Sequence, residues 1–460
     1  MHERRWVTRP VIIARGLMGR YLPQGAALLS VLIFGSYVMG LVRDRIFAQT
    51  FGAGAELDAY NAAFVLPELL LDVLVEAGLA APFIPIFLQL RSAADGHEGD
   101  RFARTILSAA VGVMGVAAVV MFVFAEQTTG FIAPGFEGAQ RELYVDLFRL
   151  MLATPILFAA SLTLGQVLLA EQRFFWYGIA PLLYNAGIIV GTVLFSDGLG
   201  IYGPAIGAVI GAAIHLASRF IGLRPSRFRI GPGWSFRMPA VGEFVRLMLP
   251  KMVSHPVEQM TFLFFTAIAS TLVAGSVTAV SFARNFQSVP VTLIGVAFAL
   301  AVFPALSTAH AVGDRRGFLR LVGTNLVSIA VITTASAIVL AIVGELAIRV
   351  LLGGGAFDAE DVALTSLVLA AFAISIPFES LTHLLSRAIY ATRHTLLQVL
   401  ASLAGLGITV LATQLLLAEL GIVAIPIGFA IGQVAKVGLL GLALAVRLRG
   451  WAIRPAVWSG

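Results

Sequence analysis

Long apolar runs separated by short polar segments fill the chain from residue 25 to residue 446. A helix that crosses a bilayer needs about 20 predominantly apolar residues, with a range of roughly 17–25. The longer runs are expected to tilt or to project beyond the lipid. The predicted transmembrane helices lie at 25–42, 58–90, 104–125, 143–170, 176–195, 201–218, 241–272, 275–307, 321–343, 361–388, 395–417 and 421–446. The pattern therefore predicts an all-α polytopic membrane protein with about 12 transmembrane helices.

Basic residues gather in alternate connecting segments. With the amino terminus inside, the inside segments contain 22 of the 31 Lys and Arg residues. The outside segments contain only Arg43, Arg45, Arg141 and Arg349. Because cytoplasmic loops carry the excess of Lys and Arg, both termini are expected inside. Residues 1–24 and 448–460 are then cytoplasmic ends, and residues 223–239 form a basic cytoplasmic linker.

Composition excludes a water-soluble protein. Hydrophobic residues make up 59% of the chain, charged residues 12%, and the mean hydropathy is +0.93, whereas soluble domains carry about 25% charged residues. The net charge of +6 falls in short clusters between apolar runs, which indicates lipid headgroups as partners and not nucleic acid. The chain has no cysteine, no Walker loop and no His-Glu-x-x-His motif. We therefore expect no cofactor, no metal, no enzymatic activity and no ATP-driven pump.

The two halves of the sequence resemble each other at a nearly constant offset. Arg173 and Arg393 stand in similar segments 220 residues apart, and the Gly200 and Gly421 segments are 221 residues apart. This predicts two six-helix lobes, an N-lobe over 25–222 and a C-lobe over 240–447. An even number of helices in each makes the repeats parallel, an arrangement found in transporters with a cavity between two bundles.

Acidic residues recur every four positions in the second apolar run, at Glu68, Asp72 and Glu76. On a helix this spacing places all three on one face. Ionisable groups at bilayer depth are costly and usually face a cavity or a partner. The stripe indicates a cavity wall that binds protons or cations. The alternative is a structural pairing of Glu68 or Asp72 with Arg43 or Arg45.

The seventh run combines Lys251, Glu258 and Gln259 with two prolines. Prolines free backbone carbonyls, which is tolerated where helices line an aqueous cavity. The side chains would form a cationic and amide surface suited to an anionic headgroup.

Further polar candidates lie in the second half. Arg284 and Asn285, near the start of the eighth helix, are expected to face the cavity. Glu379 and His383 stand four apart in the tenth helix, where they either neutralise each other or relay protons. Asp72, Glu379 and His383 are therefore the candidates for ion coupling. Lys436, near the inside end of the twelfth helix, is expected to snorkel to headgroups.

Several short motifs occur in a fixed order along the chain. They are Gly40–Asp44, Phe51–Gly54, Asp58–Tyr60, Leu66–Pro67, Glu76, Phe83–Pro85, Ala133–Phe136, Pro250 with Gln259, Pro304–Ser307 and Gly355–Asp358. As a set, from about residue 30 to residue 446, they resemble the MurJ (MviN) family of lipid II flippases, in the multidrug/oligosaccharidyl-lipid/polysaccharide exporter superfamily.

The resemblance implies two lobes around a V-shaped cavity that moves an undecaprenyl-pyrophosphate-linked peptidoglycan precursor outward across the bacterial cytoplasmic membrane. It also implies a role in cell-wall biogenesis and cell shape, with cell-wall synthesis or division proteins as candidate partners. By the family match Arg43 is a cavity arginine that Asp44 orients, with Glu76 nearby. Arg43, Lys251 and Arg284 would hold the pyrophosphate, while Glu76 and Glu258 would tune or couple transport. Gln259 and Asn285 complete the predicted binding set.

The sequence also departs from the family pattern. Tyr37, Leu71 and Asp72 stand where members usually carry arginine, and the second-lobe arginine is Arg284 where Asn285 is the aligned position. Two further carboxyl-terminal helices found in many members are not expected before residue 460.

Two other functions remain open from the residues alone. The acidic stripe suits a cation-coupled multidrug exporter of the same superfamily, because organic cations favour carboxylates. A membrane scaffold derived from a flippase, with no transport activity, is the second alternative.

Overall fold

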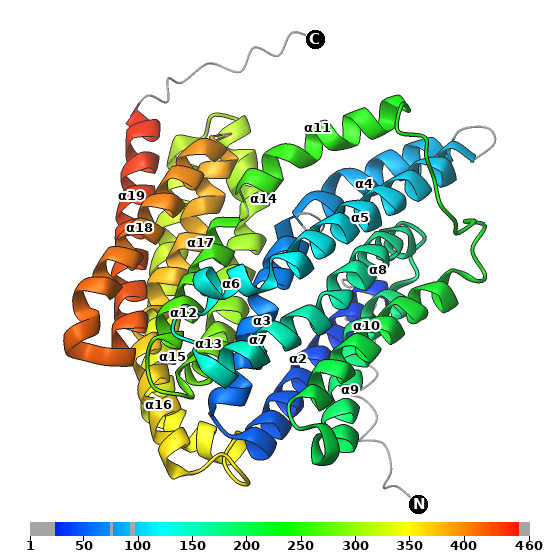
Figure 1. Ribbon diagram of the computed structural model, residues 1–460. Helices are drawn as coiled ribbons and strands as arrows, with labels where there is room; N and C mark the ends of the chain where they lie inside the picture. Colours follow the sequence, from blue (N-terminus) through cyan, green and yellow to red (C-terminus); the bar gives the residue numbers. More distant parts are fainter. Residues whose placement is uncertain (1–23, 74–76, 93–96, 255, 393, 450–460) are drawn as a thin grey trace, which may run out of the picture. The chain divides into compact units, whose positions relative to one another are not determined.

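The computed structural model describes residues 24–449, except 74–76, 93–96, 255 and 393 (Figure 1). Regular structure in the described residues is helical, and β-structure there is limited to an isolated bridge between Gly354 and Phe357. The predicted all-α fold class is confirmed.

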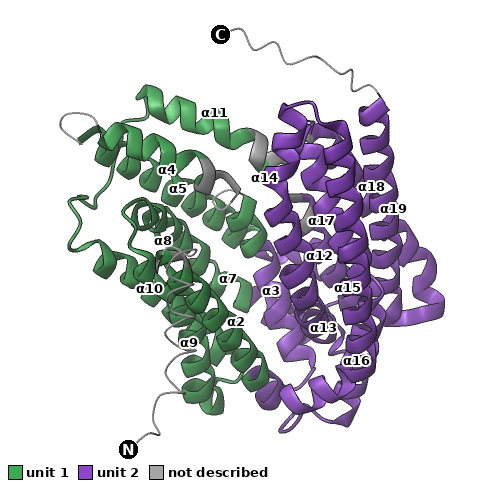
Figure 2. Ribbon diagram, turned by 180° about the vertical axis from the view of Figure 1, so that it is seen from behind, with its two compact units in different colours: residues 1–46, 67–124, 147–253 green, residues 47–66, 125–146, 254–460 purple. Residues whose placement is uncertain are grey.

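Two compact units divide the chain (Figure 2). Unit 1 contains residues 1–46, 67–124 and 147–253, and unit 2 contains residues 47–66, 125–146 and 254–460. The segments 47–66 and 125–146 thus pack with the second half of the sequence, although they precede it by more than 100 residues. The predicted lobe boundaries at 222 and 240 stay a prediction.

Unit 1 is built from α4 (Ala77–Arg91), α5 (His97–Val123), α8 (Ala153–Ala170), α9 (Phe174–Leu199), α10 (Tyr202–Leu223) and most of α11 (Pro239–Ser254). Unit 2 is built from α6 (Ala125–Ile132), α12 (Pro256–Ser270), α13 (Ser276–Pro290), a π-helical turn (Val291–Val296), α14 (Ala297–Ala311), α15 (Arg315–Leu351), α16 (Ala359–Ala373), α17 (Ile376–Ala391), α18 (Thr395–Leu420), a 3₁₀ turn (Gly421–Val423) and α19 (Ala424–Arg449). The unit boundary crosses α2 (Gln24–Phe51), α3 (Ala55–Leu71) and α7 (Gly138–Met151).

Eight described helical stretches are long and apolar enough to span a bilayer, or nine if α16 and α17 count as one span bent by 44°. The predicted count of twelve is not confirmed. One reason is that residues 74–76 and 255 lie outside the described residues, so the runs 58–90 and 241–272 each contribute two described helices of 15–17 residues. Pro67, Pro82 and Pro85 lie inside the first pair of helices, which continue past them.

A second reason is that neighbouring helices join into one stretch. The predicted helices at 395–417 and 421–446 are present as α18 and α19, which together form the 54-residue stretch Leu396–Arg449. At 1.5 Å per residue this stretch is about 80 Å long, enough for two crossings of a 30 Å core.

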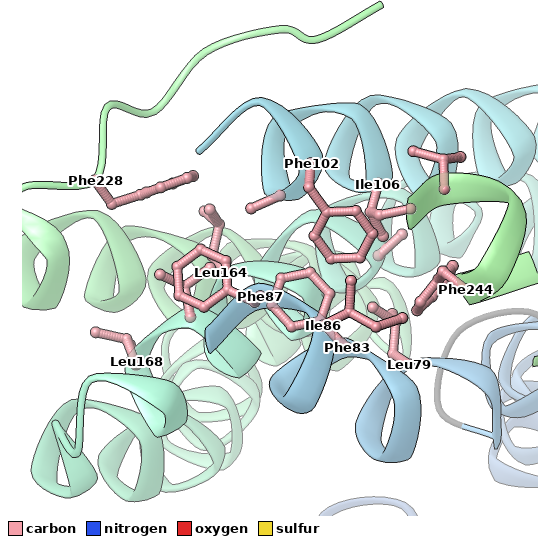
Figure 3. Packing of buried hydrophobic residues seen from close by; sticks show 14 of the residues in the cluster. Leu79, Phe83, Ile86, Phe87, Phe102, Ile106, Leu164, Leu168, Phe228 and Phe244 are labelled. Atoms are coloured by element: carbon pink, nitrogen blue, oxygen red, sulfur yellow. The ribbon is translucent and has the colours of Figure 1, made fainter. Parts of the chain in front are cut away.

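Each unit has its own apolar core. In unit 1, Phe83 and Phe87 of α4 stack with ring centroids 5.7 Å apart, and Phe102 of α5 lies 5.5 Å from Phe83 (Figure 3). Leu164 of α8 packs into the same cluster. In unit 2, α14, α15, α17 and α19 share a second cluster that includes the fully buried Phe318. The second cluster includes residues of α17 and α19, the helices that carry Glu379 and Lys436.

Backbone geometry supports the internal repeat. Helices α9 and α18 both contain 26 residues. They end at Gly200 (φ 54°, ψ −134°) and Gly421 (φ 52°, ψ −132°), 221 positions apart. A positive φ is accessible to glycine at little cost, so the same residue ends both helices in the same way.

Candidate functional site

Arg43 lies inside a long helix of unit 1, eight residues before the end of α2 at Phe51. The prediction that it belongs to an outside loop is wrong, because no helix breaker occurs until Gly52, whose φ is +65°. Its Nε and Nη2 donate to Asp44 Oδ1 at 3.1 and 2.8 Å, and its Nη1 donates to Asn185 Oδ1 of α9 at 3.2 Å. The Arg43 side chain keeps 27% of its surface exposed, against 11% for Asp44. The guanidinium is thus oriented by two partners and still accessible.

Asn185 was not among the predicted site residues, although its contacts are linked to a proline in the same helix. Pro181 has no N–H, so the carbonyl of Tyr177 loses its helical donor. Arg219 of α10 supplies the missing donor: its Nη1 binds the carbonyls of Trp176 and Tyr177 at 2.7 and 2.8 Å. Asn185, one turn after the proline, donates its amide to the Pro181 carbonyl at 3.1 Å and points its oxygen at Arg43. A proline followed four residues later by an asparagine in an apolar run was the sequence pattern that could have identified Asn185.

The acidic stripe of the second run is only partly within the described residues. Glu68 is exposed on α3, and Asp72 is half-buried in a π-helical turn just beyond Leu71. A π-helical turn changes the rotation per residue, so the regular four-residue spacing ends there. Glu76 lies outside the described residues, and the stripe stays a prediction. Tyr37 is 65% exposed on α2.

The seventh predicted run divides into α11 and α12 on either side of residue 255. The side chains of Lys251 and Glu258 lie outside the described part of the chain, and their predicted roles are untested. Gln259 is half-buried on α12.

Arg284 of α13 forms the most complete ion pair of unit 2. Its Nη1 and Nη2 donate to Glu379 Oε2 and Oε1 of α17 at 2.8 and 2.5 Å, a two-pronged contact. Gln287, one turn further along α13, accepts from Arg284 and donates to Glu379 Oε2 at 2.8 Å. The carboxylate of Glu379 is therefore held by Arg284 and Gln287. Asn285 is exposed, because adjacent positions on a helix point about 100° apart.

A cavity of about 80 Å³ adjoins this ion pair. Arg284, Glu379, His383 and Lys436 line it, together with side chains of α12 and α18. Lys436 is only 6% exposed, so the prediction that it snorkels to headgroups is wrong. Helix α19 continues to Arg449, roughly 20 Å beyond Lys436 at 1.5 Å per residue.

The internal repeat shows how the residues at the equivalent positions of the two halves differ. At an offset of 221 residues, Phe158, Tyr184 and His215 correspond to Glu379, Gly405 and Lys436. In unit 1 the ring of Phe158 contacts the rings of Tyr184 and His215, each at 4.9 Å between centroids. These aromatic side chains fill the space. In unit 2 a glycine replaces the tyrosine, and the equivalent positions are charged.

Asp58 of α3 is a buried carboxylate that was predicted only as part of the Asp58–Tyr60 motif. Its Oδ2 accepts from the backbone N–H of Gly275, and its Oδ1 accepts from both the N–H and the hydroxyl of Thr278, all at 2.7 Å. It thereby caps α13 from 217 residues away, where the first N–H groups of a helix need acceptors. Gly275 has φ +92°, and a Cβ there would lie 2.1 Å from the Ala53 carbonyl oxygen. This cap holds the helix that carries Arg284.

A family model described as "Lipid II flippase MurJ" matches residues 47–455, which is most of the chain. The chain belongs to the MurJ family. A relative from Thermotoga maritima named "Probable lipid II flippase MurJ" is 30% identical over 361 residues, covering 78% of this chain and 72% of that protein. The protein is accordingly a multi-pass membrane transporter and not an enzyme.

Solved structures agree with this MurJ assignment at the level of the fold. A lipid II flippase MurJ in an inward closed conformation matches with a TM-score of 0.77 at 23% identity, over 91% of this chain and 87% of that one. An inward-facing MATE family transporter of the MOP superfamily matches with a TM-score of 0.76 at 16% identity, over 93% and 99% of the two chains. Both matches show that this chain has the same fold as these transporters.

The Asp58 cap gives a first prediction for this MurJ family member. Asp58→Ala should lower the free energy of unfolding by about 3 kcal/mol, because three buried donors lose their acceptor. Thermal unfolding of the detergent-solubilised protein measures the loss. Asp358→Ala is the matched control, since Asp358 caps α16 from an exposed site and should cost about 1 kcal/mol. Equal losses in the two variants would contradict the account.

Proposed function

We propose that the protein translocates lipid II across the bacterial cytoplasmic membrane by alternating access. The family match over residues 47–455 carries this proposal. The relative from Thermotoga maritima is named for the same activity. Parallel repeats of six helices are the architecture in which such transport is known.

The substrate's pyrophosphate is the group that the two arginines suit. A guanidinium presents a planar fork of donors that matches phosphate oxygens. Arg43 of unit 1 is half-buried, oriented by Asp44 and Asn185. Arg284 of unit 2 is oriented by Gln287 and two aromatic rings. We propose that both arginines contact the headgroup, with Lys251, Glu258, Gln259 and Glu76 as further members of the binding set.

The proposal also covers the coupling of transport to an ion gradient and the orientation of the protein in the membrane. Glu379 and His383 line one cavity, and they, with Asp72, are the groups proposed to couple transport to an ion gradient. Both termini are proposed to lie in the cytoplasm, as the distribution of Lys and Arg indicates. Cell-wall synthesis or division proteins are the proposed protein partners.

Rescue of cells depleted of their own lipid II flippase tests the proposed function. Expression of this protein should restore growth and rod or coccoid shape, with the cells accumulating no unflipped precursor. Membrane insertion is checked in parallel by a carboxyl-terminal fluorescent fusion. Correct insertion together with lysis of the depleted cells would contradict the proposal and would favour a scaffold without transport activity.

A further inference from the structure

Arg284, which we propose binds the substrate's pyrophosphate, already holds an anion from its own chain. Its two terminal nitrogens donate to the two oxygens of Glu379 at 2.8 and 2.5 Å. Carboxylates and phosphates both accept a pair of parallel N–H bonds from a guanidinium. The donors that would hold a phosphate are therefore the donors that Glu379 occupies.

We propose that Glu379 is an internal counter-ion for Arg284, which the substrate's pyrophosphate displaces when it binds. The inference rests on the proposed function in one respect, the identity of the incoming anion. Pairing with Glu379 keeps Arg284 neutralised between transport cycles, because an unpaired charge at bilayer depth is costly. The exchange replaces one anion by another and leaves the cation buried and paired throughout.

The surroundings of the pair indicate which partner moves. The guanidinium of Arg284 contacts two aromatic rings, with its carbon 5.3 Å from the Phe262 centroid and 5.0 Å from the Phe429 centroid. Two cation–π contacts hold it in place. Glu379 lies instead in the first turn of α17, directly after the 44° bend between α16 and α17. The carboxylate is the partner that can turn away.

Gln287 connects the exchange to that bend. Its Nε2 donates both to Glu379 Oε2 at 2.8 Å and to Ser375 Oγ at 3.2 Å. Ser375 is the residue that precedes α17. When Glu379 leaves Arg284, Gln287 loses one of its two contacts next to the bend. Binding of the anion thereby changes the hydrogen bonds that hold the angle between α16 and α17.

Space for the exchange is available beside the pair. The adjoining cavity of about 80 Å³ exceeds the roughly 30 Å³ that a water molecule occupies in the liquid. It can hold water or the displaced carboxylate beside the pair. In the first half of the chain the position equivalent to Glu379 is Phe158, whose ring contacts those of Tyr184 and His215. The first half thus has no carboxylate at this position.

Binding of inorganic pyrophosphate to the purified protein tests the inference, with isothermal titration calorimetry as the readout. Glu379→Gln keeps the shape of the side chain and removes the competing charge, so pyrophosphate should bind about tenfold more tightly or better. Glu379→Asp keeps the charge and should bind as weakly as the wild type. Glu345→Gln is the matched control: Glu345 pairs with Arg349 on the exposed face of α15, and its loss should change nothing.

The double variant Arg284→Gln/Glu379→Gln shows whether the additional pyrophosphate affinity comes from Arg284 or from another site. It should lose the gained affinity, and a gain that persists without Arg284 would overturn the inference. Unchanged affinity in folded Glu379→Gln, verified by its thermal unfolding, would also overturn it. Lipid II translocation by the wild type is measured separately. A wild type that translocates no lipid II, together with a Glu379→Gln variant that binds pyrophosphate more tightly through Arg284, is the result that separates the two proposals. That result would support Glu379 as the counter-ion of Arg284 and contradict the proposed function.

Discussion

Arg43→Ala should reduce lipid II translocation about 100-fold or more while the protein still inserts and folds. The guanidinium is oriented by Asp44 and Asn185 and remains accessible, so it can donate two charge-assisted hydrogen bonds to the pyrophosphate. Each such bond contributes about 1.5–3 kcal/mol, and the loss of about 3 kcal/mol is roughly a factor of 100. Translocation of fluorescent lipid II in proteoliposomes measures the effect.

Two variants control for charge and position. Arg43→Lys keeps the charge but loses the planar fork, and it should retain intermediate activity. Arg45→Ala removes an exposed arginine of the same helix and should leave translocation close to the wild-type rate. Wild-type activity in Arg43→Ala would remove Arg43 from the proposed binding set.

Arg219→Met should destabilise the protein by about 3 kcal/mol. The side chain is 2% exposed and satisfies the Trp176 and Tyr177 carbonyls. It also stacks on the Tyr177 ring at 5.0 Å. Methionine fills much of the volume but donates no hydrogen bond. The Tyr177 carbonyl, which Pro181 deprives of its helical donor, then loses its partner at a cost of about 1–3 kcal/mol. Chemical or thermal unfolding in detergent reports the loss.

Pro181→Ala provides the second half of a double-mutant cycle. Alanine at 181 restores an N–H that the Tyr177 carbonyl can accept in the helix. The cost of Arg219→Met should therefore be smaller by about 1 kcal/mol in the Pro181→Ala background. Strict additivity of the two substitutions would show that Arg219 does not compensate for the proline.

The fold was largely predictable because most helices coincide with a long apolar run in the sequence. Length and hydropathy act locally, so α5, α9, α10 and α15 were found near their observed positions. The effect of a proline was less predictable, because it depends on what satisfies the freed carbonyl. In α9 the helix continues through Pro181 with the help of Arg219. Helices α3 and α4 also continue past Pro67, Pro82 and Pro85.

The candidate site was less predictable, because its contacts join distant parts of the chain. Arg43 and Arg284 were recognisable as charges in apolar runs. Their partners, Asn185 and Glu379, lie 142 and 95 positions away. Whether two such side chains come into contact depends on the rotation of each helix about its axis. Hydrophobic periodicity defines this rotation poorly in helices that are apolar on all sides. Glu379 was thus recognised as ionisable, but its contact with Arg284 was not predicted.

Accessibility of lipid II in proteoliposomes tests the central claim most directly. Purified protein is reconstituted with fluorescent lipid II in both leaflets, and a membrane-impermeant reagent then quenches the fluorophores of the outer leaflet. Empty vesicles should retain about half of the signal, whereas vesicles with the wild-type protein should lose most of it as the inner pool is moved outward. Equal protection in protein-containing and empty vesicles, with the protein folded and inserted, would contradict the account.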